Sequence, residues 1–179
     1  MSYKSALSGL ILVFVLLCAS YFASVARLST EMLVVQALSG SQWPVREVAT
    51  RILRLRTECG EDDFLPSSPI GFVVAAWEDD QLTPRYEKLI DSLIALGCDI
   101  NATGERGLTG LHSAVLFNNP RAVTSLLLRG ADKNRFIVVP GSDGNSEIPL
   151  DVLQFANYLN NEPDGVRNGV IEALEFDAQ

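Results

Sequence analysis

The sequence predicts an all-α solenoid of about four helix-turn-helix repeats, preceded by one N-terminal transmembrane or signal helix. Residues 5–26 contain no charged side chain, and about 20 consecutive apolar residues are enough to cross a bilayer. Farther along, one glycine-aspartate-asparagine pattern occurs twice at a spacing of 33 residues: Gly97, Asp99 and Asn101, then Gly130, Asp132 and Asn134. A period of this size is typical of stacked helix pairs that bury a shared apolar face.

Residues 1–27 are predicted to be a signal peptide or a transmembrane anchor. Lys4 precedes the apolar run and Arg27 follows it, a slight charge difference that favours the N-terminus inside and the repeats outside. The small residues at positions 24–26, Ser-Val-Ala, fit a signal-peptidase site. The repeats are therefore expected in the periplasm, either held at the inner membrane by a retained anchor or released after cleavage. Both arrangements stay open.

Residues 28–179 are predicted to form the repeat domain, with repeats at about 30–64, 65–101, 102–134 and 135–176. In the first repeat, which is atypical, VREVATRILRLRTECGEDDF fits the second helix and its turn. The second repeat has apolar helical stretches at SPIGFVVAAW and YEKLIDSLIALG, with an insertion between them. Solenoid ends are expected to be atypical, because one face of a terminal repeat meets water.

The third repeat carries the clearest physical signals. Thr109 is placed to cap its first helix by accepting hydrogen bonds from free backbone N–H groups. Gly130 supplies the left-handed residue that ends its second helix. The fourth repeat is expected to restart the helical pattern 39 residues later at Ile148, Pro149 and Leu150, after a lengthened finger from about Phe136 to Glu147. Its closing helix, GVRNGVIEALEF, is expected to end near Phe176.

The segment GLTGLHSAVLFNNPRAVTSLLLRGADKN, residues 107–134, resembles the ankyrin repeat. The positions that carry the resemblance are Gly107, Thr109, Leu111, His112, Ala114, Gly130, Ala131, Asp132 and Asn134, with Gly97, Asp99 and Asn101 as the matching turn one repeat earlier. Gly110 departs from the pattern, which usually has proline there, so a less rigid helix start is expected. The resemblance implies that the His112 ring hydrogen-bonds backbone near the turns, a structural rather than a catalytic role.

The resemblance also implies a concave surface, formed by the fingers and the first helices, that binds another protein. The partner-binding residues expected on this surface are Glu78, Asp79, Asp80, Glu105, Arg106, Phe117 and Arg135. Phe117 is a candidate anchor, because aromatic side chains dominate many interfaces, but it equally fits the core between repeats. The same two interpretations apply to Trp77.

The chain is acidic, with a formal net charge of −8. A nucleic-acid partner is disfavoured, because binding phosphates requires an excess of Lys and Arg. Residues 61–63 and 78–80 are two Glu-Asp-Asp runs. These runs either steer a basic protein partner towards the chain or serve solubility alone. Consecutive carboxylates lack the alternating ligand spacing of a calcium loop.

The sequence offers no evident catalytic site. His112 is the single histidine, and neither a phosphate-binding glycine loop nor a zinc-ligand array is present. We expect no enzyme activity, metal, cofactor or small-molecule substrate. Cys59 and Cys98 occupy nearly corresponding places in successive repeats, whose helices pack about 8–10 Å apart. A disulfide needs alpha carbons within about 4.4–6.8 Å, so two buried thiols are expected, and a bond only if the first repeat shifts towards the second.

These features predict a non-enzymatic protein-protein interaction module in a bacterial cell envelope. Small exported ankyrin proteins of this layout resemble immunity proteins that bind and neutralise toxic effectors, including lipases, so an immunity or inhibitor role is the first hypothesis. A periplasmic helper that protects an oxidative-stress enzyme such as catalase is the second, and a generic membrane-anchored adaptor is the third. The choice rests on resemblance, because one fold hosts many functions.

Overall fold

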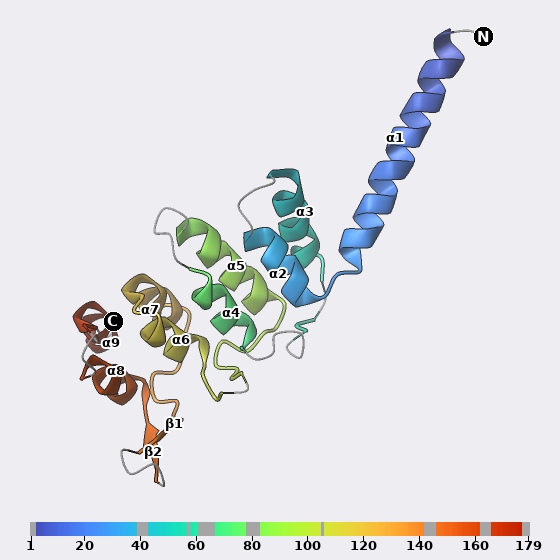
Figure 1. Cartoon of the computed structure of the whole chain (residues 1–179). Helices are drawn as coiled ribbons and strands as arrows, with labels where there is room; N and C mark the ends of the chain where they lie inside the picture. Colours follow the sequence, from blue (N-terminus) through green and yellow to red (C-terminus); the bar gives the residue numbers. More distant parts are fainter. Residues whose placement is uncertain are drawn as a thin grey trace. The chain divides into compact units, whose positions relative to one another are not determined.

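A computed structural model describes residues 3–38, 43–56, 58–60, 67–77, 83–104, 106–141, 146–161 and 166–176. Within these ranges the chain forms nine helices and one two-stranded sheet, labelled in Figure 1. The chain divides into two compact units, residues 1–56 and residues 57–179.

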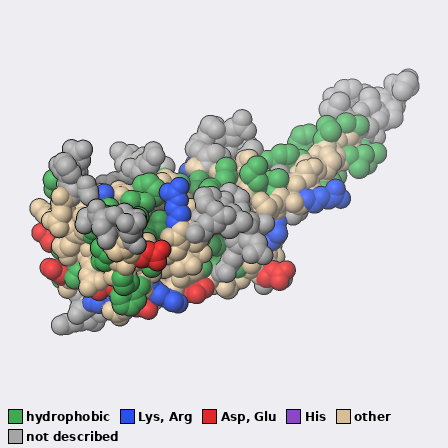
Figure 2. Space-filling model, turned by 60° about the horizontal axis from the view of Figure 1, so that its bottom comes forward, with side chains coloured by type: hydrophobic (Ala, Val, Ile, Leu, Met, Phe, Trp, Pro, Cys, Tyr) green, Lys and Arg blue, Asp and Glu red, His purple; other side chains and the backbone are tan. Residues whose placement is uncertain are grey.

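The first unit contains α1 (Tyr3–Ala26), α2 (Thr30–Leu38) and α3 (Trp43–Arg54). The side chains of residues 11–17 in α1 each expose more than half of their surface, and hydrophobic side chains are visible along this helix in Figure 2. Among the described residues, none of the helices combines the length and the apolar character that a membrane crossing requires.

The helices α2 and α3 pack against each other. Leu33 and Val34 of α2 and Leu53 of α3 are fully buried. The hydroxyl of Ser29 accepts a hydrogen bond from the backbone N–H of Met32 at 3.2 Å. This bond satisfies one of the free donors at the start of α2.

The second unit contains three helix pairs: α4 (Pro69–Ala75) with α5 (Thr83–Ala95), α6 (Gly110–Leu116) with α7 (Pro120–Leu127), and α8 (Val152–Asn160) with α9 (Asn168–Glu175). The first helices contact one another in the order α4, α6, α8, and α7 contacts α9. Figure 1 shows the three pairs following one another in a row. This unit is therefore a solenoid and not a closed globule. Each pair lies inside one predicted repeat range, although the boundaries themselves stay predictions.

Side-chain oxygens cap the first helix of every pair in the second unit. Ser68 Oγ accepts from the N–H of Gly71 at 3.0 Å at the start of α4, and Thr109 Oγ1 accepts from the N–H of His112 at 3.3 Å at the start of α6. The cap predicted for Thr109 is confirmed. The cap of α8 is Asp151, whose carboxylate accepts from the N–H of Gln154 at 2.7 Å.

The predicted restart of the helical pattern at Ile148 is wrong, because residues 147–150 form a strand. Strands β1 (Ile137–Pro140) and β2 (Glu147–Leu150) pair in antiparallel order, so the expected lengthened finger contains a β-hairpin and an all-α class is incomplete. Ile137 and Val139 are buried while Val138 is 55% exposed, the two-residue alternation of a strand. The helix begins only at Val152, where the capping box of Asp151 and Gln154 supplies the start signal.

The absence of proline at position 110 has a steric reason. A Cβ atom at Gly110 would lie 2.7 Å from Cγ2 of Ile70 in α4, closer than side-chain atoms pack. A Cβ at Gly71, on the facing helix, would lie 3.2 Å from Oγ of Ser113. Glycine at these positions therefore allows α4 and α6 to approach closely.

The recurring turn that predicts the period is built the same way in both copies. Gly97 and Gly130 have φ angles of +87° and +84°, the left-handed conformation that ends a helix, so the conformation predicted for Gly130 is confirmed. In each copy an Asp carboxylate accepts a hydrogen bond of 2.9 Å from an Asn N–H, Asn101 to Asp99 and Asn134 to Asp132. The side-chain carbonyl of Asn101 also accepts from the N–H of Asp132 at 2.8 Å. The copies are thus bonded to each other.

Cys59 and Cys98 form a disulfide, with alpha carbons 5.0 Å apart. The expectation of two buried thiols is therefore wrong. That expectation assumed the spacing of regular stacked helices, whereas the described residues around Cys59, 58–60, are not helical. A segment outside the helices can approach the closing turn of the second repeat to within disulfide range.

Candidate partner-binding site

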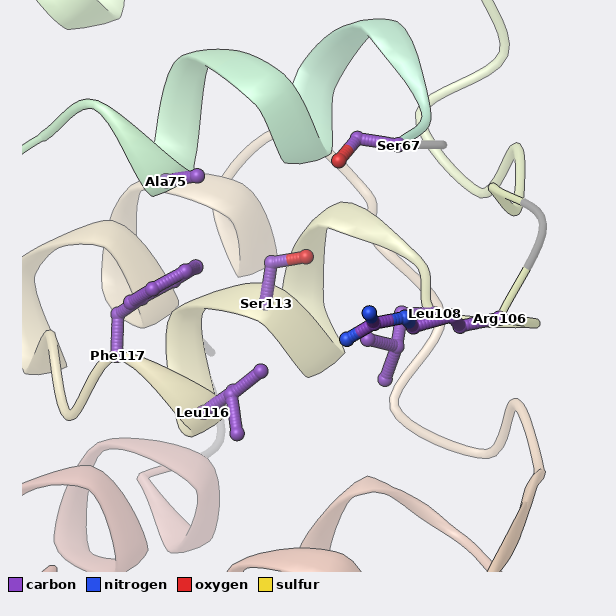
Figure 3. A pocket seen from close by; sticks show the side chains of 7 residues that line it. All are labelled: Ser67, Ala75, Arg106, Leu108, Ser113, Leu116 and Phe117. Carbon is purple, nitrogen blue, oxygen red and sulfur yellow. The ribbon is translucent and has the colours of Figure 1, made fainter. Parts of the chain in front are cut away.

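A pocket lies between α4, α6 and the finger that precedes α6. We call it the inner pocket, and its lining residues are Ser67, Ala75, Arg106, Leu108, Ser113, Leu116 and Phe117. Its cavity volume is about 180 Å³. Figure 3 shows Phe117 and Arg106 towards opposite ends of the pocket, with Ser113 between them.

Hydrogen bonds at the start of α6 fix which of its side chains face the inner pocket. The N–H of Thr109 donates to Nδ1 of His112 at 3.3 Å, the ring-to-backbone contact that the family resemblance implies. His112 is held fully buried, and the next residue, Ser113, lines the pocket. The hydroxyl of Ser113 donates to the carbonyl of Thr109 at 3.1 Å, so its orientation is fixed as well.

The buried imidazole of His112 is neutral at pH 7. Burial lowers its pKa to about 4, against smaller raising effects from the backbone of Arg135 and the carboxylate of Asp151. Among the described residues, no group forms a hydrogen bond with Nε2 of His112. The backbone of Arg135 therefore raises the pKa of His112 without lying at hydrogen-bond distance and angle. The ring packs against Phe155 of α8 with centroids 5.8 Å apart. His112 therefore connects two neighbouring repeats.

Phe117 belongs to the pocket and not to the core. It is the C-cap of α6 and is 53% exposed. The next residue, Asn118, has a φ of +52°, so the chain turns away from the helix axis immediately after the ring. The core interpretation is wrong for Phe117 and right for Trp77, which is 4% exposed and stacks on Tyr86 with ring centroids 5.2 Å apart.

Arg106 places an exposed cation at the inner pocket. In the described part of the chain, no group forms an ion pair or a hydrogen bond with its side chain. Arg135 does not line this pocket, and its guanidinium lies 4.0 Å from the carboxylate of Asp132. The other expected partner-binding residues lie outside the described residues: Glu78, Asp79, Asp80 and Glu105.

Sequence reasoning also expects Ser113 and Leu116, as first-helix residues, on the binding surface, and it misses the other three lining residues, Ser67, Ala75 and Leu108. A signal for them exists, because the first helices of the second and third repeats align at an offset of 41 residues. That offset carries Ser67 onto Leu108 and Ala75 onto Leu116. Both repeats therefore contribute corresponding positions to the same pocket.

A second pocket, which we call the outer groove, lies along the second helices. Its lining includes Glu87 of α5, Leu128 after α7 and Phe176 after α9, and its volume is about 530 Å³. Leu128 and Phe176 are 68% and 77% exposed. None of the sequence-predicted site residues lines the outer groove.

Comparison with protein families gives a match for part of the chain. Residues 79–127 match the model described as Ankyrin repeats (many copies), a segment that contains α5, α6 and α7. Searches of curated proteins and of solved structures found no significant match. Ankyrin repeats are protein-protein interaction modules, and their capped first helices, glycine turns and stacked pairs all occur here. Residues 79–127 are thus similar to ankyrin repeats.

Proposed function

We propose that this chain binds one protein partner through the inner pocket and acts without chemistry of its own. One observation carries the proposal: a single pocket combines the half-exposed ring of Phe117 with Arg106, a cation that has no partner among the described residues. Aromatic and arginine side chains supply much of the binding energy in protein interfaces. Phe117 stands at the end of α6 and Arg106 in the finger before it, so one repeat of the stack presents both side chains.

We further propose that the repeats work in the periplasm of a bacterial envelope, after export directed by residues 1–27. The charge-free run at residues 5–26 supports export. The disulfide between Cys59 and Cys98 supports an oxidising compartment, because such bonds are rare in the cytosol. The intact mass of the protein isolated from cells distinguishes a retained anchor from a cleaved signal.

The proposed role is immunity, in which stoichiometric binding neutralises a toxic effector such as a lipase. An inhibitor of this kind needs a rigid, complementary surface and no reaction. The repeat stack and the disulfide both support rigidity. The net charge of −8 supports a partner that is basic overall, because opposite charges raise the rate of encounter.

The test starts with affinity capture from the native organism, using the full chain with its N-terminal segment intact. With the purified partner, Phe117→Ser is expected to weaken binding about tenfold or more, because interface aromatics are frequent hot spots. Leu128→Ser is the matched control, since Leu128 is also an exposed apolar residue but lines the outer groove. Its affinity should equal that of the wild type.

Immunity adds a second readout in cells. The partner should be toxic when exported alone, harmless beside the wild-type chain, and toxic again beside Phe117→Ser. Unchanged affinity in Phe117→Ser contradicts the proposed surface. A captured partner that shows no toxicity contradicts the immunity role, and a catalase in that complex would favour the protective helper.

A further inference from the structure

We infer that the inner pocket recognises two neighbouring side chains of the partner, one apolar side chain of leucine or phenyl size and one carboxylate. This inference deepens the proposed function and rests on it, because the ligand is taken to be a protein segment.

The apolar end of the inner pocket sets the size of the first side chain. Ala75 of α4 and Leu116 and Phe117 of α6 gather there, as Figure 3 shows. The whole pocket has a volume of about 180 Å³. A cavity on the order of 150 Å³ with apolar walls holds one benzene molecule. The pocket therefore accommodates one large apolar side chain and not two.

The other end of the pocket sets the charge of the second side chain. Arg106 lies there, exposed and without a partner among the described residues. A guanidinium matches a carboxylate with two parallel N–H···O bonds, which makes this pairing stronger and more directional than a neutral hydrogen bond. Because both ends belong to one small pocket, the carboxylate must stand close to the apolar side chain on the partner.

Ser113 lies between the two ends and adds a third contact. Its hydroxyl hydrogen is directed to the carbonyl of Thr109 at 3.1 Å, which leaves lone pairs on Oγ as acceptors. An acceptor at this place favours a backbone N–H of the bound segment.

Arg106, the charged residue among those that line the pocket, is opposite in sign to the net charge of the whole chain, −8. A uniformly acidic partner is repelled at long range, so the segment should carry an isolated acidic residue on a surface that is otherwise neutral or basic. This combination would distinguish the partner from most acidic proteins.

The test is selection from a displayed library of short random peptides on the full chain in detergent micelles, with the disulfide intact. Enriched peptides should carry Leu, Met, Phe or Tyr with Asp or Glu one or two positions away. Arg106→Glu should weaken these peptides on the order of tenfold or more, and selection on this variant should enrich Lys or Arg in place of Asp or Glu. A loss of fold cannot produce such a switch in preference.

A second variant tests the size of the pocket. Ala75→Leu places extra atoms in the apolar end and should remove the apolar preference. Lys88→Glu and Ala95→Leu are matched controls, because they make the same kinds of change at exposed positions of α5, and they should leave the selected peptides unchanged. Circular dichroism melting curves compare the folding of all four variants.

Two results would overturn the inference while leaving the proposed function in place. One is a set of enriched peptides that bind Arg106→Glu and Ala75→Leu as well as the wild type. The other is a selection without any enriched sequence, although the captured cellular partner still binds. Failure of the cellular capture itself is read separately and contradicts the proposed function.

Discussion

At the residue scale, a small set of buried polar contacts holds α6 in place. Nδ1 of His112 accepts a hydrogen bond from the N–H of Thr109 and lies 2.8 Å from the Thr109 hydroxyl oxygen. Protonation of Nδ1 would turn this acceptor into a donor facing another donor. The fold therefore requires the neutral ring, in agreement with a pKa that burial lowers to about 4.

Acidification should consequently destabilise the fold through His112. Between the unfolded pKa of about 6.5 and the folded pKa of about 4, the unfolded chain binds a proton that the folded chain does not. The stabilisation that His112 contributes is thus complete above its unfolded-state pKa and is lost as the pH falls. The free energy of unfolding decreases by up to about 3 kcal/mol near pH 4. Urea unfolding at several pH values measures the effect. The His112→Gln variant should have a lower free energy of unfolding than the wild type at pH 7 and should lose less of it on acidification. If the free energy of unfolding of both proteins depends equally on pH, His112 does not cause the acid sensitivity.

Gly110 makes a second prediction at this scale. Gly110→Ala should lower the free energy of unfolding by about 1–3 kcal/mol, because overpacking forces neighbouring atoms to shift and the new Cβ would lie 2.7 Å from Ile70. Gly169→Ala is the control, since its nearest contact would be an ordinary 3.7 Å to Pro120. Denaturant unfolding compares the two variants, and equal stability would argue against a tight α4–α6 contact.

At the element scale, one side chain joins the ends of two first helices. The guanidinium of Arg167 donates to the carbonyls of Val115 and Leu116 in α6 and of Leu159 in α8, at 3.2 to 3.3 Å. The last carbonyls of a helix have no N–H partner within the helix. A cation is also favourable at this end of the helix dipole.

Removing this cation should destabilise the stack. Arg167→Ala is expected to lower the free energy of unfolding by about 2–4 kcal/mol, because three hydrogen bonds to a charged group are lost. Arg51→Ala is the control, because Arg51 forms an exposed pair with Glu47 and such pairs contribute about 1 kcal/mol or less. Chemical denaturation of both variants decides the question, and similar losses would contradict the joining role of Arg167.

The elements that sequence reasoning predicts well depend on local residue types. The cap at Thr109 and the left-handed turn at Gly130 each follow from one residue and its immediate neighbours. The β-hairpin was missed because Ile148, Pro149 and Leu150 were assigned to the start of a helix. The helix begins only after the capping residue Asp151, which leaves residues 147–150 free to form a strand. The role of Arg167 could not be predicted from local sequence, because its partners Val115 and Leu116 lie 52 and 51 residues earlier.

The candidate site was predicted in part for the same reason. Arg106 and Phe117 were expected from their places in the finger and the first helix of one repeat. Ser67 and Ala75 come from the preceding repeat, and only the packing of α4 on α6 brings them into the same pocket.

At the scale of the whole molecule, the disulfide closes a covalent loop within the second unit. Cys59 and Cys98 are 39 residues apart, a separation for which loop-closure entropy predicts about 4 kcal/mol of stabilisation. The double variant Cys59→Ser, Cys98→Ser should lose up to this amount, and a reducing agent should have the same effect on the wild type alone. Thermal unfolding with and without the reductant provides the measurement. Wild-type stability that does not respond to reduction would contradict a structural role for the bond.

A protein partner that occupies the inner pocket of the repeat stack should lie within reach of Phe117 and not of Leu128. The most direct measurement replaces Phe117 or Leu128, one at a time, by a photoreactive benzoylphenylalanine in the full chain and irradiates cells of the native organism. Both residues are exposed, but Phe117 lines the inner pocket and Leu128 the outer groove. Occupancy of the inner pocket predicts one cross-linked protein from position 117 and none from position 128. A cross-link from position 128 alone, or none from position 117, would contradict it.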